Sequence, residues 1–100
     1  MGRDADKRKF VDVMVACYMK DVMVQDHFDN FASKDRMNVA TLRLADFQDG
    51  LKQLDIRWSP LESEKFFNLI DEAFNSRPMN NIEPNQIDTA VNLEVGQTIA

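Results

Sequence analysis

The amino-acid sequence predicts an all-α protein: a paired helix-loop-helix fold with an additional N-terminal helix and at most a two-strand β-bridge. One apolar pattern occurs twice, at an offset of 40 residues. Its members are Leu42, Phe47 and Leu51 in the first copy and Ile82, Ile87 and Val91 in the second. Before each copy lies a second repeated pair, Phe28 with Phe31 and Phe67 with Ile70. Each copy therefore predicts a helix, a loop and a second helix.

The composition limits the size and the chemistry of the protein. With 100 residues and 44% hydrophobic content, the chain suits one domain with a single core that buries about two-thirds of its unfolded surface. The net charge of -5 argues against nucleic-acid binding, which depends on clustered Lys and Arg. Cys17 is the only cysteine and cannot form an internal disulfide, so we expect a buried thiol and a reducing, cytoplasmic compartment.

The N-terminal helix is expected to run from about Asp6 to Met19. Its apolar residues cover most of its circumference, so it should be covered on two sides, either by its own domain or by another protein. Membrane insertion is not expected, because the apolar stretch is shorter than the roughly 20 residues of a membrane span and contains Asp12. Asp21 then either caps a new helix from Val22 to about Ala32 or lies within one long helix.

Two further helices have clear sequence signals. Phe47, Leu51 and Leu54 are spaced i, i+4 and i+7, which predicts a helix from about residue 44 to Asp55. Ser59-Pro60-Leu61-Glu62 predicts the start of the next helix, because a serine cap, a proline at the first helical position and a glutamate three residues after the cap form a capping box.

The last helix is expected to begin at Glu83-Pro84 and to include Ile87 and Val91. Residues 94–100 have no counterpart in the repeat and are expected to form a frayed tail. The predicted organisation is therefore an N-terminal apolar helix over residues 1–20, the helix-loop-helix pair over residues 21–93 and the tail over residues 94–100.

The spacing of the repeat resembles the EF-hand pair of calmodulin-like and light-chain-like proteins, over roughly residues 21–93. The run DFQDGLKQLDI is similar to the exiting helix and linker of that family, and SPLESEKFFNLIDEAF to the entering helix of a second hand. The resemblance implies that Leu42 and Ile82 pair across a small β-bridge, each five residues before the first core position of the exiting helix.

Both loops depart from a calcium-binding loop, which needs oxygen ligands at six positions and a glycine at the sixth position. The first loop, counted back from Phe47, places Met37, Val39 and Arg43 at ligand positions. The second, counted back from Ile87, begins at Asn75 and places Arg77 and Met79 there. Both loops are also longer than those of the family. We therefore expect no metal and no cofactor.

Catalysis has little support in the sequence. His27 is the only histidine and lies ten residues from Cys17, so the two fall on different helical faces and do not form a nucleophile pair. We expect His27, flanked by Asp26 and Asp29, to be a solvated surface residue. The three glycines are isolated and form no phosphate-binding loop. The chain is therefore not expected to be an enzyme.

Recognition of another protein remains as the expected function. The sequence predicts a calcium-independent interaction module, or light-chain-like subunit, that binds an amphipathic partner helix; the acidic surface suits a basic one. The residues expected to contact the partner are Phe10, Met14, Tyr18, Trp58 and Met79, although Trp58 can instead fill the gap between the two halves. The alternatives are an obligate structural subunit of a large assembly, a calcium-responsive EF-hand regulator and a helical bundle unrelated to EF-hands.

Overall fold

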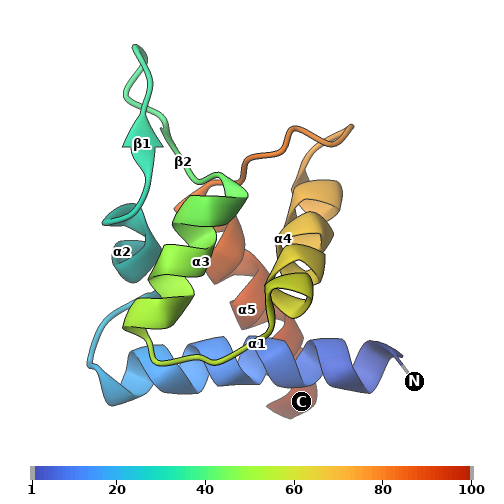
Figure 1. Cartoon of the computed structure of the whole chain (residues 1–100). Coiled ribbons are helices and arrows are strands. Elements are labelled where there is room, and N and C mark those ends of the chain that lie inside the picture. The colour runs from blue at the N-terminus through green and yellow to red at the C-terminus, as the bar shows by residue number, and fades with distance from the viewer. Residues whose placement is uncertain (1, 100) are drawn as a thin grey trace.

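The computed structural model describes residues 2–99, and the side chains of residues 7–95 within them. This part of the chain is mainly helical, as predicted, and contains a small two-stranded sheet (Figure 1). The elements in order are α1 (Gly2–Met19), α2 (Val24–Asp29), β1 (Ser33–Lys34), β2 (Ala40–Thr41), α3 (Leu44–Gln53), α4 (Pro60–Phe74) and α5 (Pro84–Ile99). None of the helices described here has the length and hydrophobicity needed to cross a bilayer.

Helix α1 runs across one end of the other helices, and the two long loops lie at the opposite end (Figure 1). α1 packs against α2 and α5, α2 packs against α5, and α3 packs against α4. The N-terminal helix is thus folded back onto its own domain, which was one of the two arrangements that its apolar circumference allowed.

The two loops meet at an isolated antiparallel bridge between Leu42 and Ile82. The amide of Leu42 donates to the carbonyl of Ile82 at 2.7 Å, and the amide of Ile82 donates back at 2.9 Å. Both side chains are buried. The predicted pairing is confirmed, and the two loops do not lie far apart as a bundle of unrelated helices would have allowed.

The first loop also forms a hairpin that the sequence analysis did not predict. Strands β1 and β2 pair antiparallel, with Ser33 opposite Thr41 and Lys34 opposite Ala40. The segment lacks the alternation of apolar and polar residues that marks a half-buried strand, because its side chains are mostly exposed on both faces.

The core is centred on phenylalanine rings from four helices. Phe47 of α3 stacks on Phe28 of α2 at 5.3 Å between ring centroids and on Phe66 of α4 at 5.7 Å. The ring of Phe10 in α1 lies 4.7 Å from that of Phe66, and the two rings are tilted by 51°. These offset and tilted ring contacts join α1, α2, α3 and α4 into one core.

Two predicted helix limits were wrong. Asp21 does not cap the second helix: it occupies a left-handed turn with φ of 55°, and α2 begins only at Val24. The cap comes from another helix, because the carboxylate of Asp88 on α5 accepts the amide of Gln25 at 3.0 Å. Residues 94–99 are not a separate tail either, since α5 continues to Ile99 and Val95 is buried; Ala100 lies outside the described residues.

Candidate functional site

Phe10, the first of the residues expected to contact a partner, belongs to the core. Its side chain is only 2% exposed because its ring is packed against Phe66. Met14, on the same helix, is half-buried against that core. Phe10 is therefore chiefly a core residue, and its contact with a partner stays a prediction.

The other three expected contact residues lie on different elements. Tyr18 is exposed near the C-terminal end of α1, and Met79 is exposed in the loop between α4 and α5. Trp58 is half-buried in the segment between α3 and α4, with its ring 5.2 Å from Phe66 and the Lys9 amino group 5.8 Å from its centroid. Trp58 thus packs between α1 and α4. The alternative in the sequence analysis placed it in the gap between the two helix-loop-helix halves.

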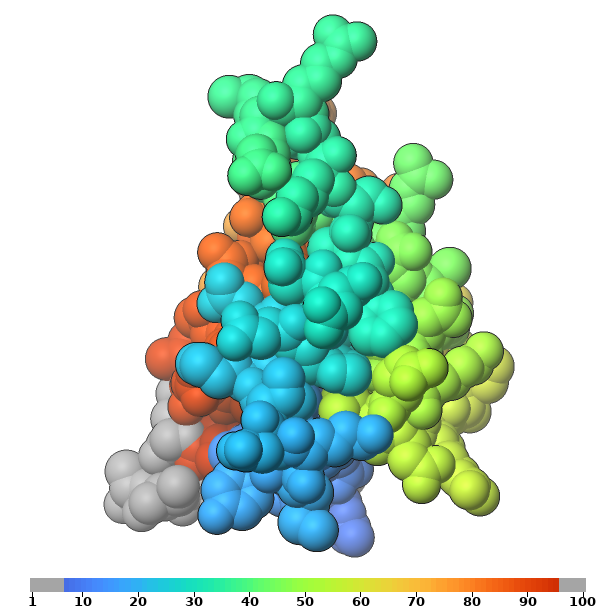
Figure 2. Space-filling view, turned by 90° about the vertical axis from the view of Figure 1, so that its left-hand side faces the viewer, coloured from blue at the N-terminus to red at the C-terminus, as the bar shows by residue number. Residues whose placement is uncertain are grey.

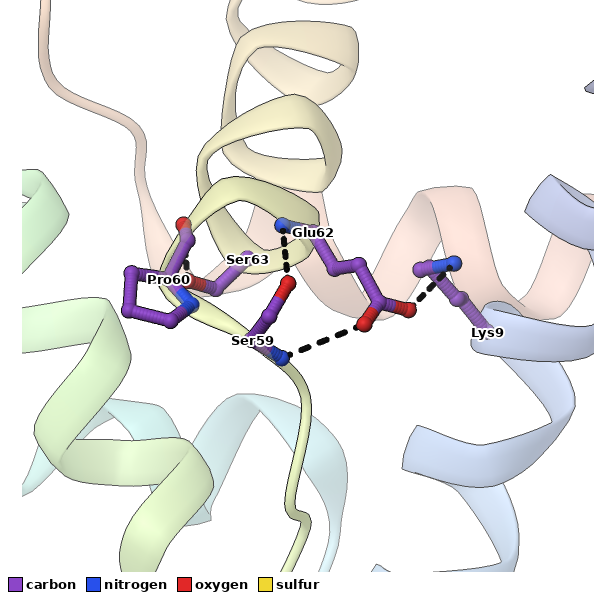
Figure 3. Close-up of polar contacts among 5 residues, drawn as sticks. All are labelled: Lys9, Ser59, Pro60, Glu62 and Ser63. Carbon is purple, nitrogen blue, oxygen red and sulfur yellow. Dashed lines mark hydrogen bonds and ion pairs between the residues drawn. The ribbon is translucent and has the colours of Figure 1, made fainter.

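Helix α1 is held to the start of α4 by a polar cluster (Figure 3). The hydroxyl of Ser59 accepts the amide of Glu62 at 3.1 Å, and the carboxylate of Glu62 accepts the amide of Ser59 at 3.2 Å, so the predicted capping box is confirmed. The same carboxylate lies 3.3 Å from the amino group of Lys9. The pKa of Glu62 is lowered, first by the Ser59 amide and then by Lys9.

An apolar concave surface lies between α4 and α5, and we call it the α4–α5 groove. It has a volume of about 530 Å³, within the roughly 300–1,000 Å³ of ligand-binding pockets. Leu69 and Phe74 of α4 and Leu93 of α5 are exposed large apolar residues along it. The charged residues that line it are Glu72 and Glu94, and Phe10 is part of its floor.

The sequence analysis missed this groove, although a signal was present. The buried face of α4 contains Phe66, Phe67 and Ile70. Leu69 lies off that face, and Phe74 lies on it but one turn beyond Ile70, where its side chain is exposed. Apolar residues outside the covered part of a helix are available to another surface. Trp58, by contrast, lines separate hollows beside the α3–α4 segment, so the structure does not bring the five expected residues into one site.

Each long loop is organised by one carboxylate that accepts backbone amides. Asp35 accepts the amides of Met37 at 2.8 Å and Val39 at 3.0 Å. Asp71 is buried at the end of α4 and accepts the amides of Met79 at 3.1 Å and Asn80 at 3.0 Å. In the second loop the carboxylate that accepts backbone amides is therefore Asp71. It lies four residues before Asn75, the residue at which the sequence analysis, counting back from Ile87, placed the start of the loop.

No group of three or more His, Cys, Asp or Glu side chains within the described residues is arranged to hold a metal ion. The side chain of Asn75 donates to Asp71 at 2.6 Å, so in this loop the buried carboxylate is surrounded by hydrogen-bond donors. Carboxylates that converge on a cation need free oxygens, whereas those of Asp71 are already hydrogen-bonded within the protein.

His27 and Cys17 are both buried, and they serve packing. The expectation that His27 is a solvated surface residue is wrong: its ring lies between α2 and α3, and Nε2 donates to the carbonyl of Gly50 at 2.9 Å. The pKa of Cys17 is raised to about 11, first by burial and then by the charge of Asp88. At neutral pH the thiol is therefore protonated, which makes it a poor nucleophile.

Comparisons of this chain with protein-family models, with curated proteins and with solved structures found no match.

Proposed function

We propose that this chain is a degenerate EF-hand pair that acts as a protein-interaction module, binding an amphipathic helix of a partner in the α4–α5 groove without calcium. The observation that carries the proposal is the groove itself, because it leaves Leu69, Phe74 and Leu93 exposed along one concave surface. A helix that places apolar anchors at i, i+4 and i+7 is a common occupant of such grooves.

The charge distribution supports a basic partner. Helix α4 contains four acidic residues and one basic residue, and the α5 segment contains two acidic residues and no basic one. Among these acids, Glu72 and Glu94 border the groove. A partner helix with Lys or Arg beside its apolar face would complement this charge, which favours specificity and a fast association rate.

The hydrogen bonding of the loops supports calcium independence. The Asp71 and Asp35 carboxylates accept hydrogen bonds from backbone amides of their loops. These hydrogen bonds order each loop, as a bound cation does in a calcium-binding loop. The Leu42–Ile82 bridge, the feature that most supports EF-hand ancestry, joins the two loops through backbone hydrogen bonds.

Isothermal titration calorimetry of the whole chain with a basic amphipathic helical peptide tests the proposal, with calcium and then with a chelator. Leu93→Asp should abolish binding, because it introduces a charge at the groove. Leu61→Asp is the matched control, since Leu61 is 60% exposed and Leu93 57%, but only Leu93 lines the groove. Loss of binding in both variants, or in neither, would contradict the location of the site. Binding that requires calcium would contradict calcium independence and favour a calcium-responsive regulator.

A second candidate function, an obligate subunit of a larger assembly, is favoured by a different surface. Tyr18 and Met19 at the end of α1 and Met23 before α2 are all exposed. Such long apolar side chains, close together along the chain, are typical of contact surfaces. A chain that aggregates unless it is co-expressed with its neighbours would favour this function, whereas a chain that remains dispersed alone would favour the interaction module.

A further inference from the structure

The β1–β2 hairpin projects from the helices as an arm. We define the hairpin arm as residues 33–39, all of which are exposed. Figure 2 shows the arm extending beyond the rest of the surface, and Figure 1 places it on the side of α2 and α3. Near its tip Met37 is 84% exposed, more than any other large apolar side chain among the described residues. A single exposed apolar residue is common on protein surfaces, so Met37 marks a contact surface only together with the shape and charge of the arm.

Hydrogen bonds hold the arm in one shape before any partner binds. The amide of Asp35 donates to the carbonyl of Val39 at 3.1 Å, and the amide of Asn38 donates to the carbonyl of Asp35 at 3.0 Å. Asn38 adopts the left-handed conformation, with φ of 63°, that closes the turn. An element that is already ordered loses less conformational entropy on binding than a flexible loop does.

The arm and the α4–α5 groove are complementary in charge and in polarity. Lys34 and Arg36 outnumber Asp35, so the arm is basic in a chain whose net charge is -5, and the Asp35 carboxylate accepts two amides of the arm itself. The groove is lined mainly by apolar residues and is bordered by Glu72 and Glu94. Met37 is the kind of flexible apolar side chain that fits irregular grooves.

We propose that the hairpin arm of one copy of this chain docks in the α4–α5 groove of a second copy, with Met37 inserted and Arg36 facing Glu72. Within one copy the arm lies on the α2 and α3 side, away from α4 (Figure 1). The contact is therefore between copies, and it joins two different surfaces. Such a head-to-tail contact forms open chains of copies unless its rotation closes a ring. A contact made by seven residues on one side is small, so the association is weak and depends on concentration.

Sedimentation velocity of the whole chain over a range of concentrations tests the contact. The wild-type chain should associate as its concentration rises, and added salt should reduce the association. Met37→Ser should weaken association roughly tenfold or more, because it removes one large apolar side chain from the interface. Leu61→Ser is the matched control, since Leu61 is 60% exposed but lies at the start of α4 outside the groove, and it should associate as the wild type does.

A mixing experiment identifies the two surfaces. Met37→Ser retains the groove and Leu93→Asp retains the arm. At a concentration at which the wild type associates, each variant alone should be largely monomeric, whereas an equal mixture should form a heterodimer that does not grow further. A wild-type chain that stays monomeric, a Met37→Ser chain that associates normally or a mixture that remains monomeric would each overturn the proposal.

Charge exchange gives an independent readout. Glu72→Arg should weaken association, and adding Arg36→Glu in the same chain should restore it. Glu64→Arg on the same helix should not weaken association. Absence of this pattern overturns the pairing of Arg36 with Glu72.

The proposed self-association and the proposed function use the same groove, but either can be refuted without the other. A monomeric chain that still binds the basic peptide would refute only the self-association, and an associating chain that ignores the peptide would refute only the helix-binding function.

Discussion

The ring of His27 and the backbone of Gly50 are joined by a hydrogen bond of 2.9 Å between Nε2 and the carbonyl oxygen. This bond brings α2 so close to α3 that a Cβ atom at residue 50 would lie 2.7 Å from two ring carbons of Phe28. Phe28 is buried and its ring is stacked on Phe47, so it has little room to move. Residue 50 is therefore glycine because of packing, although it lies inside a helix.

Gly50→Ala should destabilise the protein by about 1–3 kcal/mol, because an added methyl group overpacks the core. At an exposed helical site the same change would stabilise by roughly 0.5–1 kcal/mol. Urea unfolding followed by circular dichroism measures the difference, and Asp49→Ala at the neighbouring exposed position is the control, expected within about 0.5 kcal/mol of the wild type. A stabilised Gly50→Ala variant would contradict the close approach of α2 and α3.

Asp71→Asn should destabilise the protein by about 2–3 kcal/mol. The buried carboxylate accepts the amides of Met79 and Asn80, and an asparagine side chain would place donors against those donors. Glu72→Gln, a change of similar shape at the adjacent exposed residue, should leave the free energy of unfolding within about 0.5 kcal/mol. Thermal melts of the two variants make the comparison, and equal melting temperatures would contradict the role of Asp71 in the second loop.

Glu62→Gln should reduce the dependence of stability on acidic pH. The folded pKa of Glu62 lies below its ordinary value of 4.5, chiefly because the carboxylate accepts the Ser59 amide. Its stabilising contribution is therefore present above that ordinary value and is lost as the pH falls through the folded pKa. Denaturation midpoints of wild type and variant should converge at low pH and separate towards neutrality, with Glu64→Gln as control. Parallel curves would mean that Glu62 contributes nothing that depends on its charge.

Cys17 should resist thiol reagents until the protein unfolds. Burial raises its pKa from 9.0 to about 11, and the reagents attack the thiolate. Because the folded pKa is the higher one, the neutral thiol's contribution to stability is complete below about 9 and is lost as the pH rises towards 11. A coloured disulfide reagent at mildly alkaline pH should react slowly with the native chain and quickly in denaturant.

The control for Cys17 is a chain with Cys17→Ala and Lys20→Cys, which places the single thiol at an exposed position of the adjacent turn. This variant should react quickly without denaturant. Equal rates for the native wild type and the control would show that the end of α1 opens readily.

The sequence predicted the features that depend on local chemistry or on the repeat. Ser59 and Glu62 form the expected capping box because both partners lie within four residues of each other. Leu42 and Ile82 pair because the apolar pattern around each is the same, and both must enter the same core.

The features that the sequence did not predict depend on contacts between distant residues. The cap of α2 is Asp88, 63 residues from its amide partner Gln25. His27 is buried because α3 covers it, which its acidic neighbours in the sequence do not reveal. The α4–α5 groove requires α5 to continue past residue 93, and the repeat had no counterpart for that last part of the helix.

The backbone pairing of Leu42 with Ile82 has a consequence for how the protein opens. These two amides can exchange their hydrogens for deuterium only after the halves of the molecule separate, since both side chains are anchored in the core. The neighbouring arm has no such anchor, and its amides should exchange through local fluctuations long before. Amides that differ widely in protection should therefore lie within ten residues of each other.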